Sequence, residues 1–97
     1  MDGVEIVGND VYPLTVLIYG QPKQDQMARL RQHLEDLRIS FVEVNIEDDE
    51  RAARYVERIN HGERLTPTIV FGDEDFIIVQ PDRNELNKAL RRAGYDV

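Results

Sequence analysis

The order of apolar segments along the chain predicts an α/β domain in which helices cover a mixed four-stranded sheet. Short runs rich in β-branched residues alternate with stretches whose apolar residues recur at helical spacing, in the order β-α-β-α-β-β-α. A strand, a helix and a second strand imply a parallel right-handed crossover, and the last two strands lie close enough for an antiparallel hairpin. We therefore expect residues 1–97 to form one three-layer α/β/α domain, with its core over about 14–93.

The first strand and the first helix follow from two apolar patterns. LTVLIY, residues 14–19, is dense in β-branched and apolar residues and ends at Gly20, as a strand buried on both faces does. Apolar residues then recur at spacings of three, four and three, which is one stripe of a helix: Met27, Leu30, Leu34 and Leu37.

The second strand and the second helix are also predicted from short-range patterns. FVEVNI, residues 41–46, alternates and is rich in Val and Ile, with Val42, Val44 and Ile46 on one side. EDDERAARYVERIN, residues 47–60, places acidic residues at a helix start, where they suit the helix dipole. Gly62 ends this helix, because glycine takes a left-handed conformation most easily.

The last three elements are a hairpin and a capped helix. TIVF, residues 68–71, and FIIV, residues 76–79, are separated by the short turn GDED. Asp82 with Glu85 three residues later is a capping-box pattern that begins the last helix, and Gly94 ends it. Residues 1–13 add either an extra edge strand or a loose lead-in.

Composition limits the classes of function. The formal net charge is -7, which disfavours nucleic acid as a partner. The sequence contains neither a leader-type start nor an apolar run of membrane-spanning length, so we expect a cytoplasmic protein that does not bind membranes. There is no cysteine, which excludes a disulfide, a thiolate nucleophile and a sulfur metal site in this chain.

Three segments resemble the glutaredoxins, and most closely the bacterial glutaredoxin-like proteins of the mycoredoxin type. They are VLIYG, VNIEDDERAARYVERIN and NHGERLTPTIVF, the last of which is similar to the family's Asn-x-Gly-x-x-x-x-Pro-Thr run. The resemblance implies the thioredoxin-like fold. It also implies that Pro67 is cis and that the backbone of Thr66 is open to pair with an extended peptide or glutathione.

The resemblance also places the family's Cys-x-x-Cys motif, which this chain lacks. Counted from Tyr19-Gly20, the nucleophilic cysteine falls on Gln24 and the resolving cysteine on Met27. Neither side chain forms a disulfide or a thiolate, so two-cysteine and one-cysteine redox chemistry and iron–sulfur binding are excluded. The family's usual lysine position is Gln21 here, and Lys23 lies nearby.

Two hypotheses follow for the former active-site groove. In the first, a redox-inactive protein binds an unidentified protein partner; in the second, it retains affinity for glutathione or a related thiol tripeptide. A cysteine-free variant of an active thiol–disulfide oxidoreductase is the remaining alternative. The candidate ligand-binding residues are Lys23, Gln24, Leu65, Thr66, Pro67, Gln80, Pro81 and Asp82. Asp82 repels a carboxylate unless it is consumed as an N-cap.

Other charged residues have simpler interpretations. His33 and His61 have no partner at ligand spacing, so we expect no metal site. Four arginines lie on or near the second helix: Arg51, Arg54, Arg58 and Arg64. The first interpretation is a solvated face on which they pair with Glu47, Glu50 and Glu57. The alternative is that they bind an acidic partner or a phosphate ligand. The oligomeric state stays open.

Overall fold

A computed structural model describes residues 12–97 of the chain, and its elements follow the predicted order. The strands are β1 (Val16–Gly20), β2 (Val42–Asn45), β3 (Thr68–Phe71) and β4 (Phe76–Val79). The helices are α1 (Asp25–Asp36), α2 (Glu50–Ile59) and α3 (Arg83–Arg92). The predicted lead-in over 1–13 lies, up to residue 11, outside the described residues.

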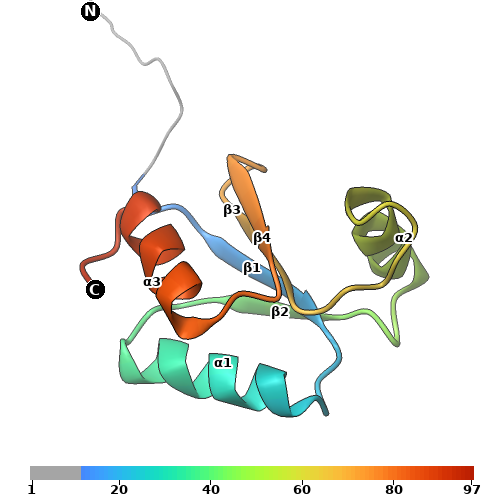
Figure 1. Ribbon diagram of the computed structural model, residues 1–97, viewed down its shortest axis with the longest axis horizontal. Helices are drawn as coiled ribbons and strands as arrows, with labels where there is room; N and C mark the ends of the chain where they lie inside the picture. The colour runs from blue at the N-terminus through green and yellow to red at the C-terminus, as the bar shows by residue number, and fades with distance from the viewer. Residues whose placement is uncertain (1–11) are drawn as a thin grey trace, which may run out of the picture.

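The sheet is mixed, as predicted, with strand order β2-β1-β3-β4. β1 pairs in parallel with β2, and Leu17 lies opposite Val42. β1 pairs antiparallel with β3, and β3 pairs antiparallel with β4 through the hairpin. Figure 1 shows α1 and α3 on one side of this sheet and α2 on the other, which is the predicted three-layer arrangement.

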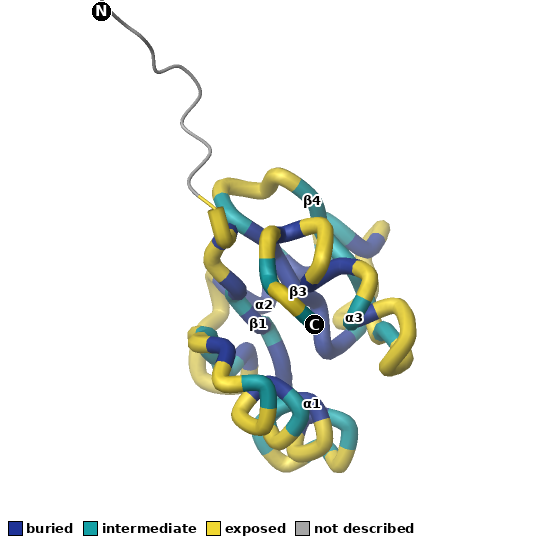
Figure 2. Tube along the Cα trace, turned by 90° about the vertical axis from the view of Figure 1, so that its left-hand side faces the viewer, coloured by how far each residue is buried: buried dark blue, intermediate teal, exposed yellow. Residues whose placement is uncertain are grey.

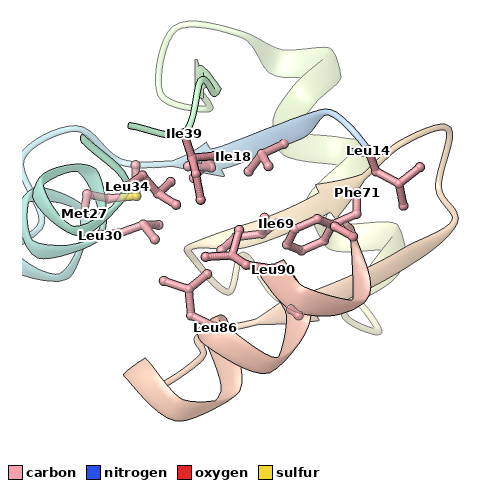
Figure 3. Packing of buried hydrophobic residues seen from close by; sticks show 13 residues of the cluster. Leu14, Ile18, Met27, Leu30, Leu34, Ile39, Ile69, Phe71, Leu86 and Leu90 are labelled. Atoms are coloured by element: carbon pink, nitrogen blue, oxygen red, sulfur yellow. The ribbon is translucent and has the colours of Figure 1, made fainter. Parts of the chain in front are cut away.

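The larger core lies between the sheet and the helices α1 and α3. Figure 3 shows Met27, Leu30 and Leu34 of α1 and Leu86 and Leu90 of α3 directed towards the apolar side chains of β1 and β3. A smaller core on the opposite face contains Ile46 and the α2 residues Ala52, Ala53 and Val56. In Figure 2 the buried segments follow the strands and the inward sides of the helices, so the outer helical faces are left to solvent.

The predicted helix boundaries are confirmed by their caps. Asp49 caps α2 by accepting a hydrogen bond from the Ala52 N–H at 3.1 Å. Asp82 caps α3 in the predicted capping box, with both reciprocal hydrogen bonds to Glu85 at 2.8 Å. Both caps satisfy backbone donors that a helix start otherwise leaves without partners. Gly94 has a φ of 102° just beyond α3, which confirms it as the stop.

The first strand differs from the prediction at its start. Leu14 is buried, but it lies outside β1, because its N–H donates to the Ala93 carbonyl at 2.8 Å. The hydroxyl of Tyr95 donates to the Leu14 carbonyl at 2.7 Å. The segment before β1 is thus held by the end of α3 at Leu14, and by the N–H of Gly72, just after β3, which donates to the Thr15 carbonyl at 2.9 Å. The apolar pattern gave no sign of this tertiary pairing.

No helix within residues 12–97 is long and apolar enough to cross a membrane.

Candidate functional site

The loop before β3 is positioned by a buried polar network. Asn60, at the end of α2, donates its side-chain amide to the Val56 carbonyl at 2.9 Å and to Thr68 Oγ1 at 3.2 Å. Thr68 Oγ1 in turn donates to the Leu65 carbonyl at 2.7 Å. Asn60 and Thr68 are both buried, and buried polar groups rarely lack such partners. The network holds the Leu65–Pro67 segment against the end of α2.

Asn60 and Thr68 were not among the predicted site residues, although they are the first and last residues of the Asn-x-Gly-x-x-x-x-Pro-Thr run. The structure explains both residues of that run, because the Asn60 side chain donates a hydrogen bond to Thr68 across the loop. The motif itself was the signal that could have identified them. The Thr66–Pro67 peptide bond within this loop is cis.

The Gln24 side chain reaches this loop from the start of α1. Gln24 is the N-cap residue, yet its side chain makes no capping hydrogen bond. Instead Gln24 Oε1 accepts a hydrogen bond from Thr66 Oγ1 at 2.8 Å. The position expected for the nucleophilic cysteine is therefore joined by its amide to the residue before Pro67.

A second glutamine, Gln80, contacts the backbone of Thr66. Gln80 follows β4 with a φ of 48°, and its N–H donates to the Pro67 carbonyl at 2.8 Å. Its side-chain amide donates to the Thr66 carbonyl at 3.2 Å. The Thr66 carbonyl, which we expected to be open, therefore already has one hydrogen-bond partner, the exposed side chain of Gln80. By contrast, no residue among 12–97 accepts a hydrogen bond from the buried Thr66 N–H.

Met27, at the expected position of the resolving cysteine, is a core residue. Its side chain is 2 % exposed and packs with Leu30 and Leu34. The backbone of Gly20 passes so close to it that a Cβ at Gly20 would clash with the Met27 thioether. The thioether thus fills the space between the end of β1 and the first turn of α1, and a larger residue at position 20 would displace the end of the Met27 side chain.

A cavity of about 260 Å³ lies next to the groove, between α1 and α3. The predicted residues Pro67, Pro81 and Asp82 line it. The other predicted residues, Lys23, Gln24, Leu65, Thr66 and Gln80, are not among its lining residues. The structure therefore divides the predicted site into a hydrogen-bonded cluster around Thr66 and a cavity lined by Pro67.

The helices supply the rest of the cavity lining. Leu30 and Leu86 are apolar, while Arg29, His33 and Arg83 add polar and charged groups, as does Gln26. His33 Nε2 lies 2.8 Å from Asn87 Oδ1, so this half-buried imidazole joins α1 to α3. Sequence reasoning treated Leu30 as part of the apolar stripe and His33 as an isolated histidine, and it assigned neither arginine to a site, since α1 and α3 become neighbours only in the fold.

Lys23 is exposed in the turn between β1 and α1. The turn is closed by a hydrogen bond from the Gln24 N–H to the Gln21 carbonyl at 3.0 Å, and Gln21 is half-buried. Asp25 follows in the first turn of α1 and places a negative charge beside the lysine. The negative charge of Asp25 therefore offsets the positive charge that Lys23 places near the start of α1.

The arginines around α2 are mostly engaged with neighbouring groups. Arg54 Nε lies 3.4 Å from a carboxylate oxygen of Glu50, and Arg64 pairs with Glu57. The guanidinium of Arg58 lies 5.7 Å from the centre of the Tyr55 ring. The interpretation as a solvated face paired with Glu50 and Glu57 is confirmed for Arg54 and Arg64, and such exposed pairs contribute little to stability.

Tyrosines on the α2 side of the sheet have perturbed ionisation. The Tyr19 and Tyr55 rings lie 5.0 Å apart, and the Tyr55 hydroxyl donates to the Glu74 carboxylate. Burial raises the pKa of Tyr55 well above its ordinary value, and the hydrogen bond and negative charge of Glu74 raise it further. Within residues 12–97 no group of three or more His, Asp or Glu side chains is placed to hold a metal ion.

The sheet order, the helices on both faces and the loop at Pro67 define a thioredoxin-like protein. In agreement, a crystal structure of a mutant of the thioredoxin-like protein BC3987 superimposes with a TM-score of 0.64 and 19% identity, covering 79% of this chain and 95% of that one. A structure of a mutant of actin interacting protein 5 gives a TM-score of 0.55 at 28% identity, covering 87% of this chain and 90% of its own.

The sequence comparisons specify the family within this fold. The family described as Glutaredoxin matches residues 16–77. Two Mycobacterium tuberculosis proteins, named "Putative glutaredoxin Rv3198A" in strain H37Rv and "Putative glutaredoxin MT3292" in strain CDC 1551, are each 36% identical over 67 residues, which is 68% of this chain and 79% of theirs. The chain belongs to the glutaredoxin family, and it lacks the cysteines of the Cys-x-x-Cys motif.

Proposed function

We propose that this chain is a binding module that holds an extended segment of a protein partner along the groove formed by Gln24, Leu65, Thr66 and Gln80. The observation that carries the proposal is the N–H of Thr66: this residue is largely buried, and its N–H has no acceptor among residues 12–97. Buried backbone donors are nearly always paired. A carbonyl from an extended peptide supplies the missing acceptor, as in strand-addition recognition.

The side chains around Thr66 support a binding role, because none of them can carry out thiol redox chemistry. Where the family motif has its two cysteines, Gln24 forms a hydrogen bond with Thr66 and Met27 fills the core. Neither group exchanges with a disulfide. Leu65 is half-buried beside Thr66 and gives the groove an apolar contact next to its polar centre.

A thiol tripeptide such as glutathione is the second candidate ligand, supported by the family membership. The start of α3 disfavours it, because Asp82 and Glu85 cap that helix with two carboxylates. Asp82 is the N-cap, and the capping box uses the N–H groups of both Asp82 and Glu85. These two backbone donors are therefore not free to bind a ligand carboxylate.

The test begins with selection from a displayed library of random linear peptides against the folded protein. A synthetic copy of the strongest binder is then titrated into ¹⁵N-labelled protein and compared with reduced glutathione. We expect amide shifts at Gln24, Leu65 and Thr66 with the peptide. The same shifts at millimolar glutathione would favour the tripeptide function instead.

Two variants and one control make the test specific. Leu65→Lys places a charge in the groove and is expected to weaken the peptide about tenfold or more. Val42→Lys is the matched control, since Val42 is 59% exposed and pairs with Leu17, away from the groove end of β1. Gln80→Ala removes the amide that occupies the Thr66 carbonyl and is expected to strengthen binding several-fold. Peptides that bind Leu65→Lys as well as they bind the parent protein would disprove the proposal.

A further inference from the structure

The cavity between α1 and α3 combines an apolar floor with two guanidinium groups. Leu30 and Leu86 are 6 % and 4 % exposed and form the floor with Pro67. Figure 3 shows these two leucines extending from α1 and α3 into the space between the helices. Such a floor suits an apolar side chain, which gains free energy in proportion to the area it buries.

The arginines at the cavity are available to a ligand. Arg29 on α1 and Arg83 on α3 are exposed, and neither forms an ion pair within residues 12–97. Elsewhere in this range Arg31, Arg54 and Arg64 all have carboxylate partners. The cavity thus carries two positive charges that have no carboxylate partner in the described part of a chain whose formal net charge is -7.

The negative charge at the cavity is smaller than the positive charge. Asp82 also lines it, and its Oδ1 accepts a hydrogen bond from the Glu85 N–H as the α3 cap. The two guanidinium groups outnumber the one carboxylate among the lining residues, which leaves an excess of one positive charge. This local excess favours an acidic ligand over a neutral or a basic one.

The cavity volume indicates how much of a ligand enters. At about 260 Å³ it is smaller than the roughly 300–1,000 Å³ of sites that enclose a whole drug-sized molecule. Its size suits one large side chain of a longer ligand. Because Pro67 belongs to both the cavity wall and the loop that carries Thr66, a chain bound at Thr66 can extend into the cavity.

We propose that this cavity anchors one apolar residue of the partner segment while Arg29 and Arg83 pair with acidic residues on either side of it. This inference rests on the proposed function and specifies the partner as an acidic peptide with an apolar anchor. Arginine forms bidentate pairs with carboxylates, so both the charge and its geometry select Asp or Glu in the flanks.

Three blocked peptides test the charge and the anchor separately. They are Asp-Glu-Leu-Glu-Asp, its amide analogue Asn-Gln-Leu-Gln-Asn, and Asp-Glu-Gly-Glu-Asp without the anchor. Each is titrated while the groove amides and the arginine side-chain Nε–H signals are recorded. We expect the acidic leucine peptide to bind best, and each of Arg29→Gln and Arg83→Gln to weaken it about three- to tenfold. Arg51→Gln on α2 is the matched control, because it removes the same charge from an exposed helical position outside the cavity lining.

Each outcome decides between the two proposals. If the amide signals of the groove residues shift and the acidic and amide peptides bind with equal affinity, the inference of an acidic partner is overturned. The proposed peptide-binding function is then still supported. Arginine signals that respond without any shift at Leu65 or Thr66 would support the cavity and overturn the groove. If inorganic phosphate alone reproduces the arginine shifts and competes with no peptide, the cavity is a simple anion site and the inference fails. Gln26→Trp fills the cavity from α1 and must abolish the arginine response while the amide spectrum stays dispersed.

Discussion

Restoring two cysteines tests whether the start of α1 still has the geometry that a Cys-x-x-Cys motif requires. Gln24 is the N-cap, and its carbonyl accepts hydrogen bonds from the Met27 and Ala28 N–H groups at 3.0 and 3.2 Å. In helical geometry, with a radius of about 2.3 Å and a rise of about 1.5 Å per residue, Cα atoms three residues apart lie about 5 Å from each other, and a disulfide spans Cα separations of about 4.4–6.8 Å. We therefore expect the double variant Gln24→Cys, Met27→Cys to form a disulfide.

The structure sets the size of the effect. Replacing Met27 by cysteine removes the equivalent of two methylenes from a fully packed site, which costs about 2–3 kcal/mol with the cavity left behind. Replacing Gln24 removes its hydrogen bond with Thr66, which costs about 1 kcal/mol. Closing so short a loop with a disulfide returns about 2 kcal/mol. The oxidised variant should thus recover roughly half of the stability that the reduced variant loses.

Urea denaturation with and without a dithiol reductant measures this difference, and a thiol assay counts the free cysteines. A recovery of about 2 kcal/mol corresponds to a midpoint shift of about 1–2 M urea. The variant Gln24→Ser, Met27→Ser is the control, since it makes similar cavities but has no redox dependence. If both thiols stay free under mild oxidation, or if both redox forms unfold at the same midpoint, the helix start has been remodelled and the reasoning is refuted.

Three further predictions concern the rest of the fold. Asp82→Ala should lower the free energy of unfolding by about 1 kcal/mol, because it removes the capping box of α3; an unchanged urea midpoint would contradict this. A double-mutant cycle on Arg31 and Glu43, whose two hydrogen bonds measure 2.6 and 3.2 Å, should give a coupling of about 1 kcal/mol, and a coupling near zero would show that the pair is ordinary surface charge. Tyr55 should ionise above its ordinary pKa of 10.0 in an absorbance titration. Because its folded pKa exceeds its unfolded one, the associated stability is complete below about pH 10 and is lost as the pH rises towards the folded pKa; Tyr55→Phe should remove this alkaline loss.

Local patterns were sufficient for most of the fold. The capping box at Asp82, the acidic start of α2 and the alternation of β2 each depend on residues within one or two turns of each other. Their physics is local, so one sequence reveals it. Leu14 shows the limit, because its apolar character fits a strand while its backbone pairs with Ala93, far away in the chain.

The candidate site was predictable only in part. The family motif located Gln24, Thr66 and Pro67, and the structure brings Gln24 and Thr66 into direct contact. It gave no indication that Gln80 occupies the Thr66 carbonyl, because that contact depends on the left-handed backbone at Gln80 and on the path of the chain after β4. The cavity arginines were missed for a similar reason, since Arg29 and Arg83 lie on different helices.

The sequence by itself determined the order of the elements, the helix caps and the absence of any cysteine, and with these the fold class and the loss of thiol chemistry. These features follow from residue type and short-range spacing. Only the tertiary structure decided which polar groups meet across the groove, which buried donor has no partner among residues 12–97, and which charges border the cavity. Hydrogen bonds and electrostatic pairing depend on distances of a few ångströms between residues remote in sequence, and those distances exist only once the chain has folded.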